Sequence, residues 1–188
     1  YVATKAVAKK LGIQIEELDG WTCCGASHVQ DIDPLAVLAT NARNIALAEE
    51  QGLDLMTVCN TCTLMLREAK NELDRDEVQK ARVNNILAQA GLQYKGTTEV
   101  THFLWILIRE YGLNNLKAKV VKPLSGLRVA EYYGCHLLRP QEETGFEDFQ
   151  IPTSLADVIK AIGATPIDFS RKLDCCGFHA VYPAHDSV

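Results

Sequence analysis

Apolar residues recur at helical spacing through residues 34–51 and predict an amphipathic helix there. The apolar positions that share one face of this helix are Leu35, Leu38, Ala42, Ile45 and Ala46. Asp33 is a suitable N-cap, and Pro34 occupies the first helical position, where its missing N–H costs nothing. Gly52 follows as a stop, because glycine readily adopts the left-handed conformation that ends many helices.

Apolar spacing and capping residues predict further helices and strands along the chain. Helices are expected over residues 1–10, 34–51, 83–90, 100–112 and 154–162, and from Thr63 onward. Strands are expected over residues 13–15, 53–58, 127–133 and 166–169. Ser154 and Asp157 match a capping box at the start of the last helix. Strands that alternate with helices predict a parallel sheet, and therefore an α/β fold.

One order of elements occurs twice. A helix, a glycine and a short strand precede Cys23-Cys24-Gly25, and the same series precedes Cys175-Cys176-Gly177. The two triplets start 152 residues apart, and the glycines that precede them, Gly12 and Gly163, are 151 residues apart. This repeat predicts two pseudo-symmetric modules, residues 1–122 and 123–188. Each is expected to be a small, mainly parallel sheet flanked by helices, with its cysteines at strand ends.

Composition narrows the class of protein. The 188 residues are 47% hydrophobic and 23% charged, which is typical of a globular protein. A net charge of −5 lacks the positive field of a nucleic-acid binder, so we expect no nucleic-acid partner. No apolar run approaches the roughly 18 residues of a membrane span, so we expect no direct span. Seven clustered cysteines fit a reducing compartment better than a secreted disulfide framework, and we expect a cytoplasmic location.

The cysteines form four clusters: Cys23-Cys24, Cys59 with Cys62, Cys135, and Cys175-Cys176. The CxxC pair is expected at a strand-to-helix turn, where the helix dipole and free N–H groups favour thiolate over thiol. Thiolates are the usual ligands of zinc and of iron–sulfur clusters. Adjacent cysteines favour a larger, multi-iron group, because neighbouring side chains rarely reach two corners of one tetrahedral metal. Gly25 and Gly177 permit a close backbone approach at each pair.

Simpler interpretations exist for each motif taken alone. A single CxxC is often a zinc ligand pair or a dithiol switch, and adjacent cysteines often pack as small hydrophobic residues. The repetition of the motifs in one order, at strand ends, favours a metal–sulfur site. A thioredoxin-like function is disfavoured because it would leave the additional cysteine pairs without a role.

Several segments together resemble the B-type subunit of heterodisulfide reductase and its homologues. They are Cys23-Cys24-Gly25, Asn41-Ala42-Arg43-Asn44, Val58-Cys59-Asn60-Thr61-Cys62, Tyr133-Gly134-Cys135-His136 and Cys175-Cys176-Gly177. The resemblance covers nearly the whole chain. It implies two non-cubane 4Fe-4S clusters in the full-length protein, each held by five thiolates from a single cysteine, a Cys-Cys-Gly and a CxxC.

By position, the resemblance assigns Cys23, Cys24, Cys59 and Cys62 to the first cluster and Cys135, Cys175 and Cys176 to the second. The repeat offset places the counterpart of Cys135 before Tyr1 and the counterpart of Cys59 beyond Val188. We therefore expect that the 188 residues belong to a longer chain. By themselves they would hold an incomplete first cluster and no intact second one.

The resemblance implies an oxidoreductase subunit that cleaves or forms a disulfide at its clusters, of the coenzyme M–coenzyme B type or a related sulfur substrate. It also implies a partner, a ferredoxin-like iron–sulfur subunit, and a small disulfide or thiol substrate. One alternative is an electron-transfer subunit of a succinate, lactate or glycerol phosphate dehydrogenase or of a sulfur-oxidising complex. Another, of a different class, is a zinc-binding interaction module.

Histidines supply the remaining candidates. His136 adjoins Cys135 and is a weak candidate for donating to a cluster sulfur or acting on substrate, although a structural role is twice as frequent for such a residue, by a rough estimate. His28 and His179 follow the two cysteine pairs by a few residues and are equally weak candidates for these roles. The chain has no Rossmann glycine motif and no P-loop, so nicotinamide, flavin and nucleoside triphosphate sites are not indicated.

Overall fold

The computed structural model describes residues 1–26, 28–181, 184 and 186. The chain divides into two compact units. Unit 1 consists of residues 1–15 and 102–188, and unit 2 of residues 16–101. The predicted modules 1–122 and 123–188 describe the repeat in the sequence and remain a prediction.

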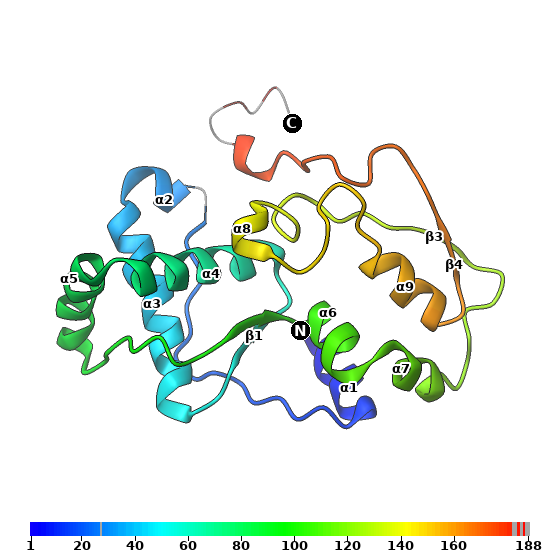
Figure 1. Cartoon of the computed structure of the whole chain (residues 1–188), viewed down its shortest axis with the longest axis horizontal. Helices are drawn as coiled ribbons and strands as arrows, with labels where there is room; N and C mark the ends of the chain where they lie inside the picture. The colour runs from blue at the N-terminus through cyan, green and yellow to red at the C-terminus, as the bar shows by residue number, and fades with distance from the viewer. Residues whose placement is uncertain (27, 182–183, 185, 187–188) are drawn as a thin grey trace. The chain divides into compact units, whose positions relative to one another are not determined.

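Unit 2 is a helical layer with one small sheet. Its elements are α2 (His28–Ile32), α3 (Pro34–Gln51), β1 (Leu55–Thr57), α4 (Asn60–Arg75), α5 (Glu77–Leu87), the short helix η1 (Ala88–Ala90) and the first two residues of β2 (Val100–His102). Helix α3 packs against α2, α4 and α5, and β1 pairs with β2 (Figure 1). The core of the unit lies where the three long helices meet, around Ile45, Leu73 and Val83, which are fully buried.

Helix α3 forms as its sequence predicts. Asp33 Oδ1 accepts a hydrogen bond from the N–H of Ala36 at 3.0 Å, and Pro34 opens the helix. Gly52 ends it in the left-handed conformation, with φ of 66°. These local signals and the apolar face agree, so the predicted bounds are confirmed.

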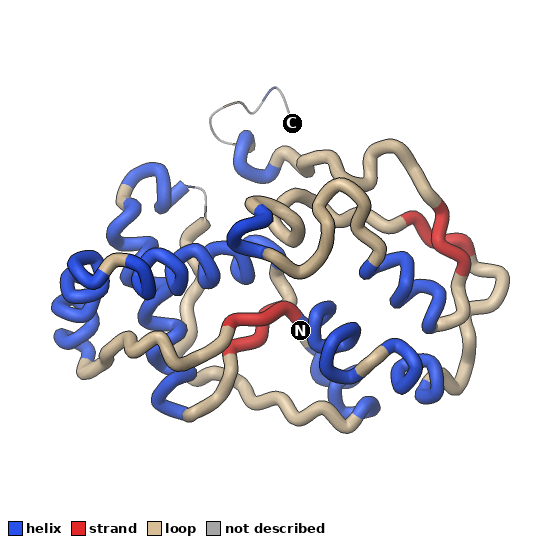
Figure 2. The backbone as a smooth tube through the Cα atoms, viewed as in Figure 1, coloured by secondary structure: helices blue, strands red, loops and turns tan. Residues whose placement is uncertain are grey.

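Unit 1 holds the second small sheet. Its elements are α1 (Val2–Leu11), α6 (Phe103–Trp105), the π-helix η2 (Ile106–Tyr111), α7 (Leu113–Lys119), β3 (Arg128–Ala130), α8 (Gln141–Thr144), α9 (Ser154–Ala161), β4 (Thr165–Ile167) and η3 (Phe178–Ala180). Strands β3 and β4 are parallel, with Arg128 opposite Thr165. The core contains Leu104, Tyr133 and Leu138. Long stretches between these elements are loop (Figure 2).

The α/β fold class is confirmed, but several predicted elements differ. Residues 13–15 form no strand, and the N–H of Ile13 bonds back to the carbonyl of Ala8 in the closing turn of α1. Residues 100–112 are not one helix: they begin as β2 and continue through α6 into a π-helix. Helix α4 begins at Asn60, three residues before the predicted start.

The capping box predicted at the start of α9 is also wrong. The carboxylate of Glu147 accepts hydrogen bonds from the N–H groups of Thr153 and Ser154 and from the Ser154 hydroxyl. A carboxylate from a preceding loop therefore satisfies the free N–H groups of this helix, and the side chain of Asp157 is not needed for the cap.

Candidate metal centre

The four cysteines of unit 2, Cys23, Cys24, Cys59 and Cys62, are referred to here as the first thiol group. Cys59 is the N-cap residue of α4, and Cys62 lies in the first turn of the same helix. The thiol of Cys62 donates to the sulfur of Cys24, with the two Sγ atoms 3.5 Å apart. Residues 38 positions apart in the sequence are thus in direct contact.

The members of this group differ in burial. Cys24 is buried and packs with Val37 and Met65, while Cys23 and Cys59 are exposed. Cys23 and Cys24 therefore face different surroundings. The exposed thiols leave one side of the group open to a ligand or partner.

Gly25 shapes the turn after the cysteine pair. Its φ of 73° lies in the left-handed region, and a Cβ at this position would meet Val37 Cγ2 at 3.3 Å. Gly177 has the corresponding conformation in unit 1, with φ of 79°. Both positions have a left-handed backbone, which glycine adopts without the steric cost that a Cβ would bring.

The protonation of the first thiol group is uneven. The Cys62 thiol donates to the sulfurs of Cys24 and Cys59, and this sharing raises the pKa of Cys62. The same contact lowers the pKa of Cys24 to about 6 and that of Cys59 to about 5. Backbone N–H groups of Thr61 and Cys62 also face the Cys59 sulfur and lower its pKa further, as expected at a helix N-terminus. Two of the sulfurs are thus thiolates at neutral pH.

The second thiol group, Cys135, Cys175 and Cys176, lies in unit 1. The Cys135 thiol donates to the Cys175 sulfur with Sγ atoms 3.8 Å apart, and the N–H of Gly177 donates to the same sulfur at 3.4 Å. Burial raises the pKa of Cys135, and sharing of its proton with Cys175 raises it further. This group is therefore less readily ionised at Cys135 than the first group is at Cys59.

The loop before Cys175 is held by the segment around Cys135. The N–H of Tyr133 donates to the carbonyl of Lys172 at 3.0 Å, and the Tyr132 hydroxyl donates to the carbonyl of Asp174 at 2.6 Å. The Lys172 ammonium also lies 3.6 Å from the buried carboxylate of Glu131. The segment that precedes Cys135 is thereby bonded to the segment that precedes Cys175.

The histidine candidates have different outcomes. The rings of His136 and His179 meet edge to face, with centroids 4.6 Å apart, and burial lowers the pKa of His136. The structure thus brings these two imidazoles together in the unit that carries the second thiol group. His28 begins α2, but its side chain lies outside the described part of the chain.

The donors present suit a thiolate-bound group. Four sulfurs converge in unit 2, two of them ionised, with backbone N–H groups directed at them. Within residues 1–26 and 28–181, and at 184 and 186, no set of three or more His, Cys, Asp or Glu side chains is arranged to hold a single metal ion. Thiolates are the usual ligands of zinc and of iron–sulfur clusters, so these donors fit a thiolate-bound metal group.

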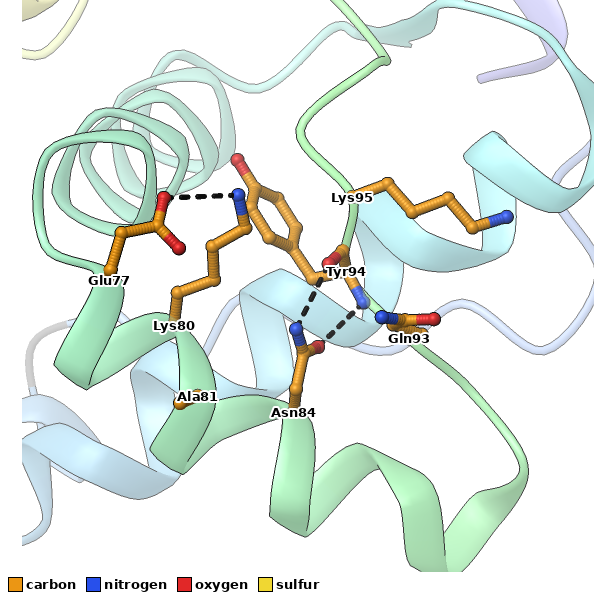
Figure 3. Close-up of a pocket in the computed structure, with 7 residues that line it drawn as sticks. All are labelled: Glu77, Lys80, Ala81, Asn84, Gln93, Tyr94 and Lys95. Carbon is orange, nitrogen blue, oxygen red and sulfur yellow. Dashed lines mark hydrogen bonds and ion pairs between the residues drawn. The ribbon is translucent and has the colours of Figure 1, made fainter.

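Two asparagines of α3 hold the segment that leads to Cys24, a role that the sequence did not predict. Asn41 and Asn44 of α3 bond to the backbone before and at Cys24, and no spacing rule signals such contacts. The pocket of unit 2 that lies between α5 and residues 93–95 is lined by Lys80, Asn84, Tyr94 and their neighbours and by no cysteine (Figure 3). The candidate site is therefore a surface cluster of sulfurs and not this pocket.

A two-unit α/β chain with thiol groups built from repeated Cys-Cys-Gly runs belongs to a class of cysteine-rich proteins. The family model of the CCG cysteine-rich domain matches residues 2–67 and 129–188 of this chain. The chain belongs to the CCG cysteine-rich domain family.

Curated relatives extend the comparison. The chain is 52% identical over 184 residues to the 8-methylmenaquinol:fumarate reductase membrane anchor subunit of Wolinella succinogenes, covering 98% of this chain and 63% of that protein. It is 39% identical over 176 residues to the B-type subunit of the ferredoxin/F420H2-dependent CoB-CoM heterodisulfide reductase of Methanosarcina acetivorans, covering 93% and 58%. It is 35% identical over 183 residues to a protein of Archaeoglobus profundus that is named for its likeness to the same type of heterodisulfide reductase subunit, covering 96% and 61%. The chain thus spans about three fifths of the length of these relatives.

A solved structure shares the fold. The crystal structure of a hypothetical protein from Helicobacter pylori matches 90% of this chain and 30% of its own, with a TM-score of 0.66 and 17% identity. In the part of the chain that the structure describes, no helix has the length and apolar character needed to cross a bilayer.

Proposed function

We propose that this chain is the cluster-carrying part of an oxidoreductase subunit that transfers electrons through iron–sulfur clusters. The observation that carries this proposal is the convergence of the first thiol group, with Cys24 Sγ 3.5 Å from Cys62 Sγ. Cys23, Cys24, Cys59 and Cys62 would contribute to one cluster, and Cys135, Cys175 and Cys176 to another. Two non-cubane 4Fe-4S clusters in the full-length protein are part of the proposal.

The clusters, when bound, supply one-electron transfer. The residues of this chain hold and tune them. Ionised Cys24 and Cys59 are ready to bind iron at neutral pH without losing a proton, while Cys62 must release one. The packing of Cys24 against Val37 and Met65 excludes water from one side of the site.

Of the possible roles, electron transfer within a quinol:fumarate reductase type of complex has the strongest support. The relative of that name is 52% identical over 98% of this chain, whereas the heterodisulfide reductase relatives cited are 35% and 39% identical. In this role the clusters accept and pass on electrons, and no thiol substrate binds them. We further propose a ferredoxin-like iron–sulfur subunit as a partner and a cytoplasmic location, where thiols stay reduced.

Disulfide reduction is the second candidate. It is favoured by the relatives that are named after heterodisulfide reductase and by the exposed thiols Cys23 and Cys59, which leave the first group accessible. A small disulfide or thiol, of the coenzyme M–coenzyme B type, would then be the substrate. The chain's part would be to keep both thiol groups reduced, oriented and partly shielded from water.

Anaerobic purification of the full-length protein, with iron and sulfide analysis and paramagnetic resonance, tests the proposal. We expect iron, acid-labile sulfide and visible absorption, all reduced in Cys24→Ser and retained in Val58→Ala, which changes only an exposed neighbour of Cys59. Zinc in place of iron, with no visible absorption, would overturn the proposal in favour of an interaction module.

A second measurement separates the two roles. Coenzyme M is added to the oxidised protein, and the paramagnetic resonance spectrum is recorded before and after. An unchanged spectrum supports the electron-transfer role, because no thiol binds the clusters. A new signal on addition of the thiol supports disulfide chemistry and rejects pure electron transfer.

A further inference from the structure

The segment that leads to the cysteine pair has no secondary structure of its own, yet α3 holds it at three points. The Arg43 guanidinium donates to the carbonyl of Gly20 at 2.8 Å. The Asn44 amide donates to the carbonyl of Thr22 at 2.9 Å and accepts from the N–H of Thr22 at 3.0 Å. The segment therefore binds to a helix through side chains in place of a neighbouring strand.

The third point is at the cysteine itself. Asn41 Nδ2 donates to the carbonyl of Cys24 at 3.0 Å and to the carbonyl of Val37 at 2.9 Å. Asn41 is completely buried, and its Oδ1 atom has no hydrogen-bond partner among the described residues. Rotation of this buried amide would break both of these hydrogen bonds, so the observed orientation is favoured.

The three contacts fall at every second residue. They hold the carbonyls of Gly20, which lies in a turn with φ of 75°, and of Thr22 and Cys24 in the stretch without regular secondary structure that follows. With those carbonyls fixed on α3, the register of the segment is set. Cys24 then lies against Val37 and Cys62, and a slip by one residue would place Cys23 there instead.

We propose that Asn41 and Asn44 are positioning residues of the first thiol group: their side-chain amides set the register of residues 20–24 and so place Cys24 Sγ in contact with Cys62 Sγ. This inference deepens the proposed function, on which its relevance to the clusters rests. The amides touch neither sulfur, so their effect passes through the backbone of Thr22 and Cys24.

Unit 2 contains a matched control for this role. Asn84 of α5 makes the same pair of hydrogen bonds with Tyr94, accepting from its N–H at 2.8 Å and donating to its carbonyl at 3.1 Å (Figure 3). The Asn84 pair of hydrogen bonds holds a loop that carries no cysteine. Loss of the Asn84 side chain and loss of the Asn44 side chain each remove a similar pair of hydrogen bonds, but we expect only the loss of Asn44 to disturb the thiols.

The test uses the rate of disulfide formation to report whether the two thiols are in contact, independently of iron. The full-length protein is prepared reduced and without iron, and diamide is added, which takes the two hydrogens of a thiol pair as a disulfide forms. The rate of Cys24–Cys62 bond formation is followed by peptide mapping in wild type, Asn44→Ala, Asn41→Ala, Asn44→Asp and Asn84→Ala. All are compared below their melting temperatures, which are measured by circular dichroism.

We expect the Cys24–Cys62 disulfide to form roughly tenfold more slowly in Asn44→Ala and Asn41→Ala, because small displacements of reacting groups have large effects on rate. Asn84→Ala should melt at a temperature as low as that of Asn44→Ala but keep the wild-type rate. Asn44→Asp keeps the acceptor for the Thr22 N–H and should fall between Asn44→Ala and wild type.

Equal rates in wild type, Asn44→Ala and Asn41→Ala would overturn the positioning role, whether or not iron is bound in the native protein. An equal slowing in Asn84→Ala would overturn it too, since loss of stability would then explain the effect. Slowing in the α3 variants alone, in a protein that proves to contain no iron, would reject the proposed function while leaving the positioning role intact.

Discussion

Replacement of Gly25 by alanine tests how tightly the turn after the first cysteine pair is packed. Two costs apply at this position. The backbone has φ of 73°, and an L-residue in the left-handed region loses about 1–2 kcal/mol. The new Cβ would also meet Val37 Cγ2 at 3.3 Å, closer than ordinary van der Waals contact.

The second cost is estimated from the neighbour. Val37 is only 3% exposed and branches at Cβ, so it cannot easily move aside. Overpacking of this kind usually destabilises by about 1–3 kcal/mol, and a single close contact belongs at the low end. Gly25→Ala should therefore destabilise by about 2 kcal/mol, of which about half is backbone strain.

The control is Gly52→Ala. Gly52 has φ of 66° and no heavy atom within 4 Å of its would-be Cβ, so this variant has the backbone cost alone. The assay is thermal unfolding of the full-length protein, purified anaerobically and followed by circular dichroism. Gly25→Ala should melt a few degrees below Gly52→Ala, and in a Val37→Ala background the difference should largely disappear.

Two results would refute this reasoning. If Gly25→Ala and Gly52→Ala melt together, the contact with Val37 is not restrictive. If the full cost of Gly25→Ala persists when Val37 is already alanine, the strain lies elsewhere in the turn.

Two further predictions concern ionisation and capping. In the reduced, iron-free protein, alkylation of Cys59 by iodoacetamide should be nearly constant from about pH 6 to 8 and fall as the pH drops through its pKa of about 5, because only the thiolate reacts. Alkylation of Cys135, whose pKa is raised, should instead climb with pH over that range, and parallel profiles by mass spectrometry would contradict the assignment. Asp33→Ala removes the cap on α3 and should lower the free energy of unfolding by about 1 kcal/mol in urea titration, whereas Asp31→Ala, at an exposed neighbouring residue, should lower it little.

Much of the first thiol group could be anticipated from local signals. The strand-to-helix turn at Cys59 follows from an apolar strand running into a helical pattern, and the structure places Cys59 at the N-cap of α4. The caps and bounds of α3 were predictable for the same reason, since caps and helical periodicity involve residues within a few positions of each other.

Other predictions failed where distant contacts override local preference. Residues 100–112 carry an apolar run that reads as a helix, but Val100 and His102 form a strand with β1, and the remainder becomes a π-helix. Ser154 and Asp157 match a capping box, yet Glu147 takes over the cap. A periodic pattern does not contain the position of a partner strand or of a carboxylate several residues upstream.

The sequence by itself determined which residues can ligate a metal, because seven thiols in a repeated order define that chemistry wherever the chain folds. Only the tertiary structure decided that Cys24 meets Cys62 across 38 residues, that two asparagines of α3 hold the approach to Cys24, and that Cys59 and Cys135 ionise differently. The physical reason is that composition sets which donors exist, while packing sets their separation, their burial and the protons they share.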